Sequence, residues 1–281
     1  MIKKAYLEIT NVCNLSCSFC HKTKRKKHFL TPQEFDLLTD RLTGEIKYLY
    51  FHLMGEPTLH PSLPAFIASA REKGFLPIIT TNGSLLRKVG DTLLDTPPHK
   101  VSISLHAPSA NDAFSDETYL DSCISFAKSA AAKGCYIAFR LWNLQSDDEK
   151  ENAAILDRLK LAFPEIWTDI RNGSGKKIAE NVYLEFAPRF DWPDINIPDI
   201  IPENAPAFCY GLRDQIGILC DGTVVPCCLD SEGALPLGNL FQSDLSSILS
   251  SPTAQAIYNG FSQRRAVAPL CRKCGYATRF L

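Results

Sequence analysis

The residues with the most distinctive chemistry lie near the start of the chain. Cys13, Cys17 and Cys20 have the spacing Cys-x3-Cys-x2-Cys, so three thiolates within eight residues can converge on one metal centre. A structural zinc site needs four ligands, and His21 is the nearest further candidate. An iron–sulfur cube held by three cysteines would instead leave one iron open to a substrate or cofactor. On spacing alone a cluster, a zinc knuckle and three buried thiols all remain possible.

The chain has 281 residues, 11 of them cysteine, and its start lacks the apolar stretch of a secretion signal. Because the cytosol keeps thiols reduced, we expect a cytoplasmic protein whose cysteines bind metal. Hydrophobic residues make up 45% and charged residues 22%, which is typical of a globular domain. A net charge of −1 and the lack of a long apolar run predict neither nucleic-acid nor membrane binding.

Six β-like runs, most of them followed by a helical pattern, predict parallel strands joined by right-handed crossovers. The expected strands are residues 5–10, 46–53, 76–81, 101–105, 135–141 and 182–186. Thr31, Pro32 and Glu34 have the types and spacing of a helix cap. A doubly wound sheet and a partly closed barrel would both place ligands beyond the carboxyl ends of these strands, and periodicity alone does not decide between them.

The sequence becomes rich in proline from residue 188 onward. Five prolines between Pro188 and Pro206 are typical of a linker. Two β-like runs around Asp221-Gly222 then predict a hairpin, and a single helix is expected over residues 244–258. We therefore expect two domains, residues 1–190 and residues 191–281.

The segment Cys13-Asn14-Leu15-Ser16-Cys17-Ser18-Phe19-Cys20 resembles the signature of the radical S-adenosylmethionine (SAM) superfamily, including the aromatic Phe19 before the last cysteine. The resemblance implies a partial (β/α)6 TIM-like barrel and a 4Fe–4S cluster held by the three cysteines. SAM would chelate the fourth iron, and an electron from the cluster would split SAM into methionine and a 5′-deoxyadenosyl radical that abstracts a substrate hydrogen.

Further segments over roughly the first 145 residues match this family in order, each at the end of a strand. They are Gly55-Glu56-Pro57, Thr80-Thr81-Asn82-Gly83, Ser102-Ile103-Ser104-Leu105-His106 and Arg140. The resemblance implies that Glu56 contacts the SAM ammonium, that Ser104 and His106 lie near the ribose, and that Arg140 pairs with the SAM carboxylate. His106 stands where many members have Asp. Alone, each segment is equally typical of a turn or a surface contact.

The carboxyl-terminal cysteines resemble the SPASM and twitch extensions of the same family, which carry auxiliary iron–sulfur clusters. The resemblance implies a second, auxiliary 4Fe–4S cluster bound by Cys209, Cys227, Cys271 and Cys274. Cys228 is adjacent to Cys227 and could replace it. A four-cysteine zinc ribbon is the competing interpretation, because the same residues satisfy its ligand count.

By analogy with members that have this extension, we expect a radical SAM oxidoreductase that abstracts hydrogen from a peptide or protein side chain. A reductant such as flavodoxin or ferredoxin is the implied partner. Alternatives are dehydrogenation of a small alcohol, modification of RNA, and a non-enzymatic zinc-binding adaptor. Five cations at residues 22–27 could grip RNA phosphates, but no aromatic residue interleaves them, so nucleic acid is disfavoured.

Overall fold

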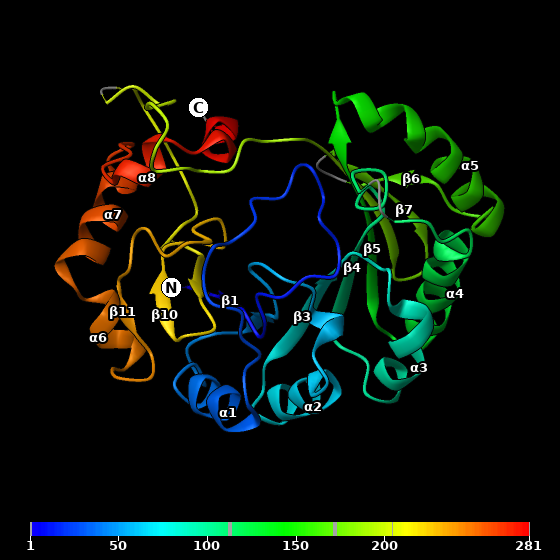
Figure 1. Cartoon of the computed structure of the whole chain (residues 1–281), viewed down its shortest axis with the longest axis horizontal. Coiled ribbons are helices and arrows are strands. Elements are labelled where there is room, and N and C mark those ends of the chain that lie inside the picture. Colours follow the sequence, from blue (N-terminus) through cyan, green and yellow to red (C-terminus); the bar gives the residue numbers. More distant parts are fainter. Residues whose placement is uncertain (1, 112–113, 171–172, 204, 281) are drawn as a thin grey trace.

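The computed structural model of the chain describes residues 2–111, 114–170, 173–203 and 205–280. At its centre lie six strands that pair in parallel and in sequence order. They are β1 (Lys4–Leu7), β2 (Tyr48–Tyr50), β3 (Leu76–Thr81), β4 (Lys100–Ser104), β5 (Tyr136–Leu144) and β8 (Val182–Pro188). A doubly wound sheet would reverse its strand order at a switch point, whereas this order does not reverse. The sheet curves into an open barrel, which confirms the predicted partial (β/α)6 barrel (Figure 1).

Five helices follow the strands and cover the outer face of the barrel (Figure 1). They are α1 (Pro32–Asp40), α2 (Leu63–Glu72), α3 (Leu86–Asp95), α4 (Tyr119–Ala132) and α5 (Asn152–Ala162), with short 3₁₀ turns at Pro57–Leu59 and Asp147–Glu151. The predicted cap of α1 is confirmed, because the Glu34 amide donates to the Thr31 hydroxyl and the Thr31 amide donates to the Glu34 carboxylate. Within the described residues, no helix is long and apolar enough to cross a membrane.

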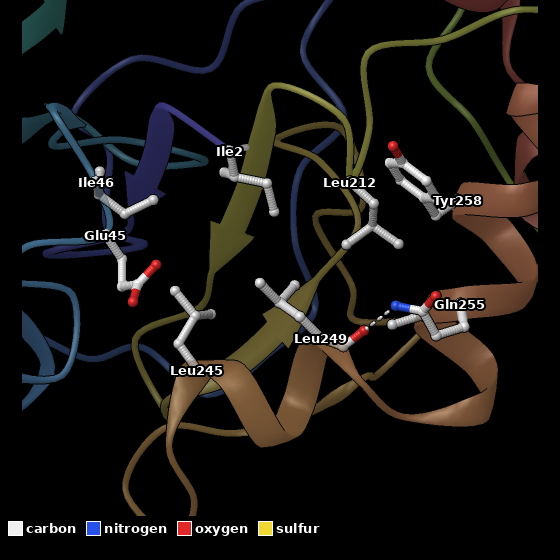
Figure 2. A pocket seen from close by; sticks show the side chains of 9 residues that line it. Ile2, Glu45, Ile46, Leu212, Leu245, Leu249, Gln255 and Tyr258 are labelled. Carbon is white, nitrogen blue, oxygen red and sulfur yellow. Dashed lines mark hydrogen bonds between the residues drawn. The ribbon is translucent and has the colours of Figure 1, made fainter.

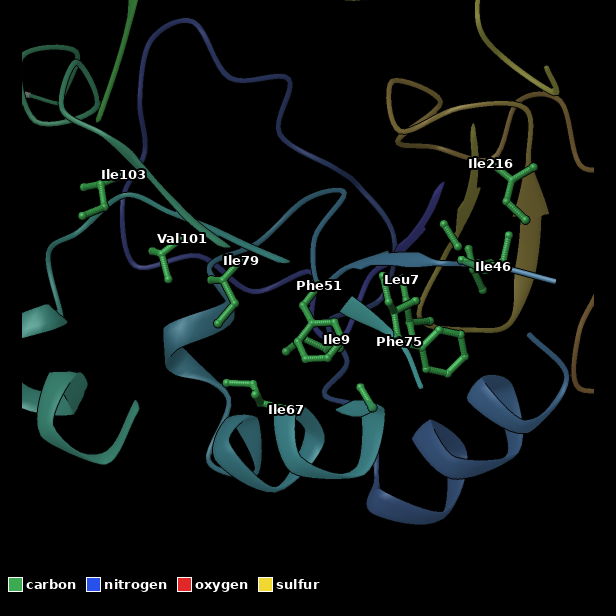
Figure 3. Packing of buried hydrophobic residues seen from close by; sticks show 14 of the residues in the cluster. Leu7, Ile9, Ile46, Phe51, Ile67, Phe75, Ile79, Val101, Ile103 and Ile216 are labelled. Carbon is green, nitrogen blue, oxygen red and sulfur yellow. The ribbon is translucent and has the colours of Figure 1, made fainter. Parts of the chain in front are cut away.

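The main core lies between the sheet and these helices (Figure 3). Alternate strand residues point outward to it, among them Leu7, Phe51, Ile79 and Val101, and each is fully buried. Successive side chains of a strand point to opposite faces. The intervening residues of the same strands therefore face the inside of the barrel, where the polar residues of the candidate site gather.

Both edges of the sheet carry strands beyond the six parallel ones. The predicted hairpin forms β9 (Gln215–Ile218) and β10 (Thr223–Val225); β9 pairs in parallel with β1, and β10 pairs with β11 (Gly238–Asn239). The other edge holds β6 (Thr168–Asp169) and β7 (Gly175–Ala179), which run antiparallel and were not expected. Regions from both predicted domains thus share one sheet.

The prediction of a single helix over residues 244–258 is wrong. It is two helices, α6 (Leu245–Leu249) and α7 (Pro252–Ser262), followed by α8 (Pro269–Arg272) and a 3₁₀ turn at Gly275–Phe280. Pro252 lacks the amide that would continue the first helix and instead occupies the first turn of the second. The Ser251 hydroxyl caps that turn by accepting from the Ala254 amide at 3.3 Å. The boundary between residues 190 and 191 stays a prediction.

Candidate active site and metal centres

The loop between β1 and α1 carries the first three cysteines and is closed at its base by hydrogen bonds. The Asn11 side-chain amide donates to the Lys26 carbonyl at 2.9 Å, and its carbonyl oxygen accepts from the His28 amide at 2.9 Å. The Thr10 hydroxyl donates to the His28 carbonyl at 2.8 Å. Because its ends are held together, the segment between them projects as one loop, here called the cluster loop (residues 11–28).

The three thiols of the cluster loop lie close enough to interact electrostatically: Cys13, Cys17 and Cys20. Burial, followed by repulsion from the neighbouring thiols, raises the pKa of Cys17 to about 11 and that of Cys20 to about 12. The Leu15 amide points at the Cys13 sulfur from 3.4 Å, as a donor to a thiolate would. Cysteines bind metal as thiolates, which burial in the protein alone disfavours. The positive charge of a bound iron–sulfur core would stabilise these thiolates. The donor set therefore fits an iron–sulfur cluster.

The Gly55-Glu56-Pro57 segment packs directly against the cluster loop. Gly55 has φ +76°, and a Cβ there would lie 2.3 Å from the Thr10 carbonyl oxygen, so only glycine fits. Glu56 is buried, and its amide donates to the Val12 carbonyl at 2.8 Å. This segment thereby fixes the start of the cluster loop against the end of β2.

The Glu56 carboxylate joins the ends of β2 and β3. It accepts from the Asn82 amide at 2.7 Å, from the Thr81 hydroxyl at 2.7 Å, and from the amide and hydroxyl of Thr58. Burial raises the pKa of Glu56, and these bonds oppose that rise. The predicted contact between Glu56 and the SAM ammonium stays a prediction. In the structure, the Glu56 carboxylate holds the ends of β2 and β3 together.

Asn82 connects β3 to the cluster loop. Its side-chain amide donates to the Asn14 side-chain carbonyl at 3.0 Å and lies 3.9 Å from the Cys13 sulfur. Its carbonyl oxygen accepts from Ser84. Cys13, Glu56 and Asn82, which come from three separate segments, are thus brought to one place.

The other predicted SAM-binding residues lie at the carboxyl ends of β4 and β5. The rings of Phe19 and His106 are 5.1 Å apart, so the cluster loop meets the end of β4. His106 Nδ1 lies 3.0 Å from the Arg140 carbonyl oxygen, and Ser104 is paired with Arg140 across the sheet. Pro57 is buried in the turn after Glu56.

The Arg140 side chain points into the barrel and lies on its carboxyl-terminal side. Its guanidinium carbon stacks 3.3 Å from the centre of the Trp142 ring, and Nε lies 4.0 Å from the nearer Glu185 oxygen. The charges that act on it come from Glu185, Tyr6, Cys228 and Tyr276. Its pairing with the SAM carboxylate stays a prediction.

The second cysteine group also comes together. Burial and repulsion from Cys228, Cys209 and Cys271 raise the pKa of Cys227 well above its usual value. Cys274 interacts with Cys209 and Cys271. The Gly211 amide points at the Cys209 sulfur from 3.4 Å. Four thiols that can each serve as one ligand are the donor set of a cluster without an open iron.

Among the described residues, no three His, Cys, Asp or Glu side chains converge tightly enough to hold a single metal ion. A zinc ion binds each sulfur at about 2.3 Å and so draws its ligands close together. In a 4Fe–4S cube each cysteine binds a different iron, which allows wider spacing.

Two family models match the chain. The model of the radical SAM superfamily matches residues 7–130, and the SPASM model, an iron–sulfur cluster-binding domain, matches residues 209–275. The chain belongs to the radical SAM superfamily. It is an enzyme of that family with a C-terminal SPASM domain, and its cofactors are 4Fe–4S clusters and SAM. The zinc-binding adaptor considered above is therefore set aside.

Sequence relatives of this radical SAM protein include a probable GTP 3′,8-cyclase of Metallosphaera sedula, 28% identical over 78% of each chain. A tungsten-containing aldehyde ferredoxin oxidoreductase cofactor-modifying protein of Pyrococcus furiosus is 37% identical over 30% of this chain and 25% of its own. Among solved structures, BtrN in complex with AdoMet and 2-DOIA has a TM-score of 0.59 and 18% identity, covering 98% of this chain and 93% of its own. Streptococcus suis SuiB bound to the precursor peptide SuiA has a TM-score of 0.60 and 17% identity, covering 98% and 70%.

Three features of the radical SAM protein's site were missed from the sequence. Arg189 lies 5.1 Å from the Phe19 ring, and its charge reaches Cys17. Arg25, counted above among the five cations at residues 22–27, forms a buried ion pair with Glu8 at 2.6 Å. His52, just after β2, stands edge-on to the rings of Tyr6 and Tyr50. The contacts of Arg189 with Phe19, of Arg25 with Glu8 and of His52 with Tyr6 join residues that are distant in sequence, so no local pattern indicates them.

A pocket of about 290 Å³ lies away from these groups (Figure 2). It sits near the amino ends of β1 and β2 and is lined by Ile2, Glu45, Ile46, Leu212, Leu245, Leu249, Ala254, Gln255 and Tyr258. Ligands of parallel barrels bind at the opposite, carboxyl ends of the strands. We therefore assign this pocket to the packing of α6 and α7 against the barrel and give it no part in the chemistry.

The His52 ring should give the stability of the protein a distinct pH dependence. Burial, followed by the charge of Arg140, lowers the pKa of His52 to about 3. Between that value and about pH 6.5 the unfolded chain binds a proton that the folded chain does not, so stability falls as the pH falls. Relative to His52→Gln, the wild type should lose about 1.4 kcal/mol per pH unit below pH 6. Denaturant unfolding of both proteins from pH 7 to pH 5 measures this difference, and parallel curves would contradict it.

Proposed function

We propose that this radical SAM enzyme binds the SAM-ligated cluster through Cys13, Cys17 and Cys20 and abstracts a hydrogen atom from a peptide or protein side chain. The observation that carries the first part is the position of Cys13 beside Asn82, which in turn binds Glu56 at the carboxyl ends of β2 and β3. Cys17 and Cys20 both lie close enough to Cys13 to interact with it electrostatically. When bound, the reduced cluster and SAM supply the 5′-deoxyadenosyl radical.

The chain's own residues bind and orient these groups. Asn82 and the Leu15 amide offer donors beside the Cys13 sulfur, and the Phe19 ring of the cluster loop packs 5.1 Å from the His106 ring. The predicted contacts of Gly55, Glu56 and Pro57 with the SAM ammonium, and of Ser104 with the ribose, belong to this proposal.

We further propose that Cys209, Cys227, Cys271 and Cys274 hold the auxiliary cluster. An external one-electron donor such as flavodoxin or ferredoxin completes the reaction. The support for a peptide substrate comes from two fold neighbours: SuiB was crystallised with its precursor peptide, and anSMEcpe with the Cp18Cys peptide. A small substrate is the second candidate, favoured by the polar inner face of this barrel.

Anaerobic reconstitution with iron and sulfide, followed by SAM and dithionite, tests the proposed reaction. We expect about eight irons per chain and formation of 5′-deoxyadenosine. With Cys13, Cys17 and Cys20 changed to Ala, about four irons should remain and no 5′-deoxyadenosine should form. Cys123→Ala and Cys135→Ala are matched controls, because both residues are buried cysteines outside the two groups. A wild type that takes up iron and binds SAM without cleaving it would refute the proposal.

The substrate class can be tested separately with extract from cells grown in deuterated water. Hydrogen abstraction from a substrate transfers one deuterium to 5′-deoxyadenosine, which mass spectrometry detects. Deuterium transfer from the peptide fraction supports the proposal. Transfer from the small-molecule fraction alone would favour the second candidate, and loss of transfer after ribonuclease treatment would favour RNA.

A further inference from the structure

Six side chains, five from different strands and one from the residue just beyond β2, form a polar group on the inner face of the barrel. We call it the inner-face cluster, and its members are Tyr6, Tyr50, His52, Lys100, Arg140 and Glu185. Their neighbours in the same strands, such as Leu7, Phe51 and Val101, point outward into the core (Figure 3). None of the six ligates either proposed iron–sulfur cluster.

The aromatic half of the inner-face cluster is tightly built. The rings of Tyr6 and Tyr50 stack with centres 4.4 Å apart and an angle of 20°. The His52 ring stands edge-on to Tyr6 at 5.4 Å. This arrangement gives a flat, apolar surface bordered by phenol hydroxyls and an imidazole.

The charged half is not electrically balanced. The Lys100 ammonium lies 2.9 Å from one oxygen of Glu185, and Arg140 Nε lies 4.0 Å from the other. Two cations therefore share one carboxylate, and Lys100 lies closer to it than Arg140 does. Arg140 keeps the excess positive charge on a side chain that is only 14% exposed.

Two buried nitrogen atoms of the cluster have no hydrogen-bond partner among the described residues. They are Arg140 Nε and His52 Nδ1. A buried polar group left unpaired costs about 1–3 kcal/mol, so such groups are uncommon unless something else pairs with them. Both atoms lie beside the stacked tyrosines, because His52 contacts their rings and the charge of Arg140 acts on both hydroxyls.

We propose that the inner-face cluster is a substrate subsite that binds an oxyanion, a carboxylate or phosphate group of the substrate, with Arg140 as its charge partner. This rests on the proposed function and names the chemistry of its substrate. A guanidinium pairs with such groups through two parallel hydrogen bonds, and stacking on Trp142 holds its plane fixed. The ligand would neutralise the excess charge and satisfy Nε.

SAM also carries a carboxylate, so the two sources of the oxyanion must be separated. Lys22 and Arg189 are cations whose charge acts on Cys17. Arg140 instead interacts with Tyr6, Cys228 and Tyr276, which lie toward the auxiliary cysteines. On this placement, Arg140 serves a substrate lying between the two cysteine groups, in place of the SAM carboxylate that the resemblance implies for it.

The test uses the reconstituted holoenzyme, saturated with SAM and without reductant. Pyrophosphate and glutarate are titrated as probes, with sodium chloride at matched ionic strength as the blank, and binding is followed by calorimetry. We expect one probe to bind, and the identity of that probe tells phosphate from carboxylate. Arg140→Met should weaken its binding at least tenfold, Arg140→Lys should weaken it less, and SAM affinity should stay within twofold of the wild type.

Arg213→Met is the matched control, because Arg213 also stacks on aromatic rings but lies outside the cluster. It should bind the probe like the wild type. The inference is overturned if neither probe binds to the wild type, or if Arg140→Met binds the probe as tightly as the wild type does. It is also overturned if Arg140→Met loses affinity for SAM instead, because Arg140 would then bind the SAM carboxylate. Thermal unfolding of each variant shows that it is folded. Cleavage of SAM is assayed on the same preparations with dithionite, so failure of the proposed function is seen independently.

Discussion

Replacing Arg25 with Met is expected to lower the free energy of unfolding by about 3–5 kcal/mol, the usual cost of removing one partner of a buried ion pair. The Arg25 guanidinium lies 2.6 Å from a Glu8 carboxylate that is fully buried. Without the cation, that carboxylate keeps neutral partners among the described residues, the amides of Met54 and Cys220 and the Cys220 thiol. An uncompensated charge would remain in the interior.

The effect should be local as well as global, because this ion pair joins three segments. Arg25 belongs to the cluster loop and donates to the Ser231 carbonyl at 2.7 Å, while Glu8 at the end of β1 accepts from Cys220 in the SPASM domain. The neighbouring Lys24 amide points at Glu232. In hydrogen-exchange mass spectrometry, residues 22–30 and 218–232 should therefore exchange faster in the variant, whereas α3 and α4 should not.

Lys4→Met is the matched control for this prediction. Lys4 and Asp214 are also 2.6 Å apart and also join β1 to the C-terminal region, but both side chains are about one-third exposed. An exposed pair contributes about 0–1 kcal/mol, so this variant should unfold almost like the wild type. Equal losses in Arg25→Met and Lys4→Met in urea unfolding would show that burial of the Glu8–Arg25 pair adds nothing.

The sequence predicted those parts of the fold that depend on local patterns. The cap at Thr31 and Glu34 is set by residues three apart, and the six parallel strands by short apolar runs, so both were found. The hairpin of β6 and β7 was missed because its strands are short and polar, with Lys176 and Lys177 at its centre. The break at Pro252, by contrast, does follow from the sequence, since proline interrupts a helix.

The candidate site shows the same division. Motifs within a few residues, such as Cys13-x3-Cys17-x2-Cys20, could be recognised from spacing. The inward turn of Arg25 could not, because an arginine among four lysines looks like a solvated loop until its distant partner Glu8 is known. The inner-face cluster escaped for the same reason, since its members are spread over five strands and meet only when the barrel closes.

Cys227→Ala is expected to remove about half of the iron, whereas Cys228→Ala should retain all of it, about eight atoms per chain. The two cysteines are adjacent, yet their surroundings differ. Cys227 interacts with Cys228, Cys209 and Cys271. Cys228 interacts with Cys209 but also with Arg140 and Tyr6, which belong to the inner face of the barrel. These contacts favour Cys227 as the fourth ligand of the auxiliary cluster.

Iron content and the visible absorption spectrum of the two reconstituted variants measure this difference, and each variant serves as the other's control. Both should still form 5′-deoxyadenosine with dithionite and SAM, because Cys13, Cys17 and Cys20 are unchanged. The reverse pattern, with iron lost from Cys228→Ala alone, would make Cys228 the ligand. It would also bring the auxiliary cluster against Tyr6 and Arg140, so that the proposed substrate oxyanion and the cluster would compete for the same space beside the stacked tyrosines.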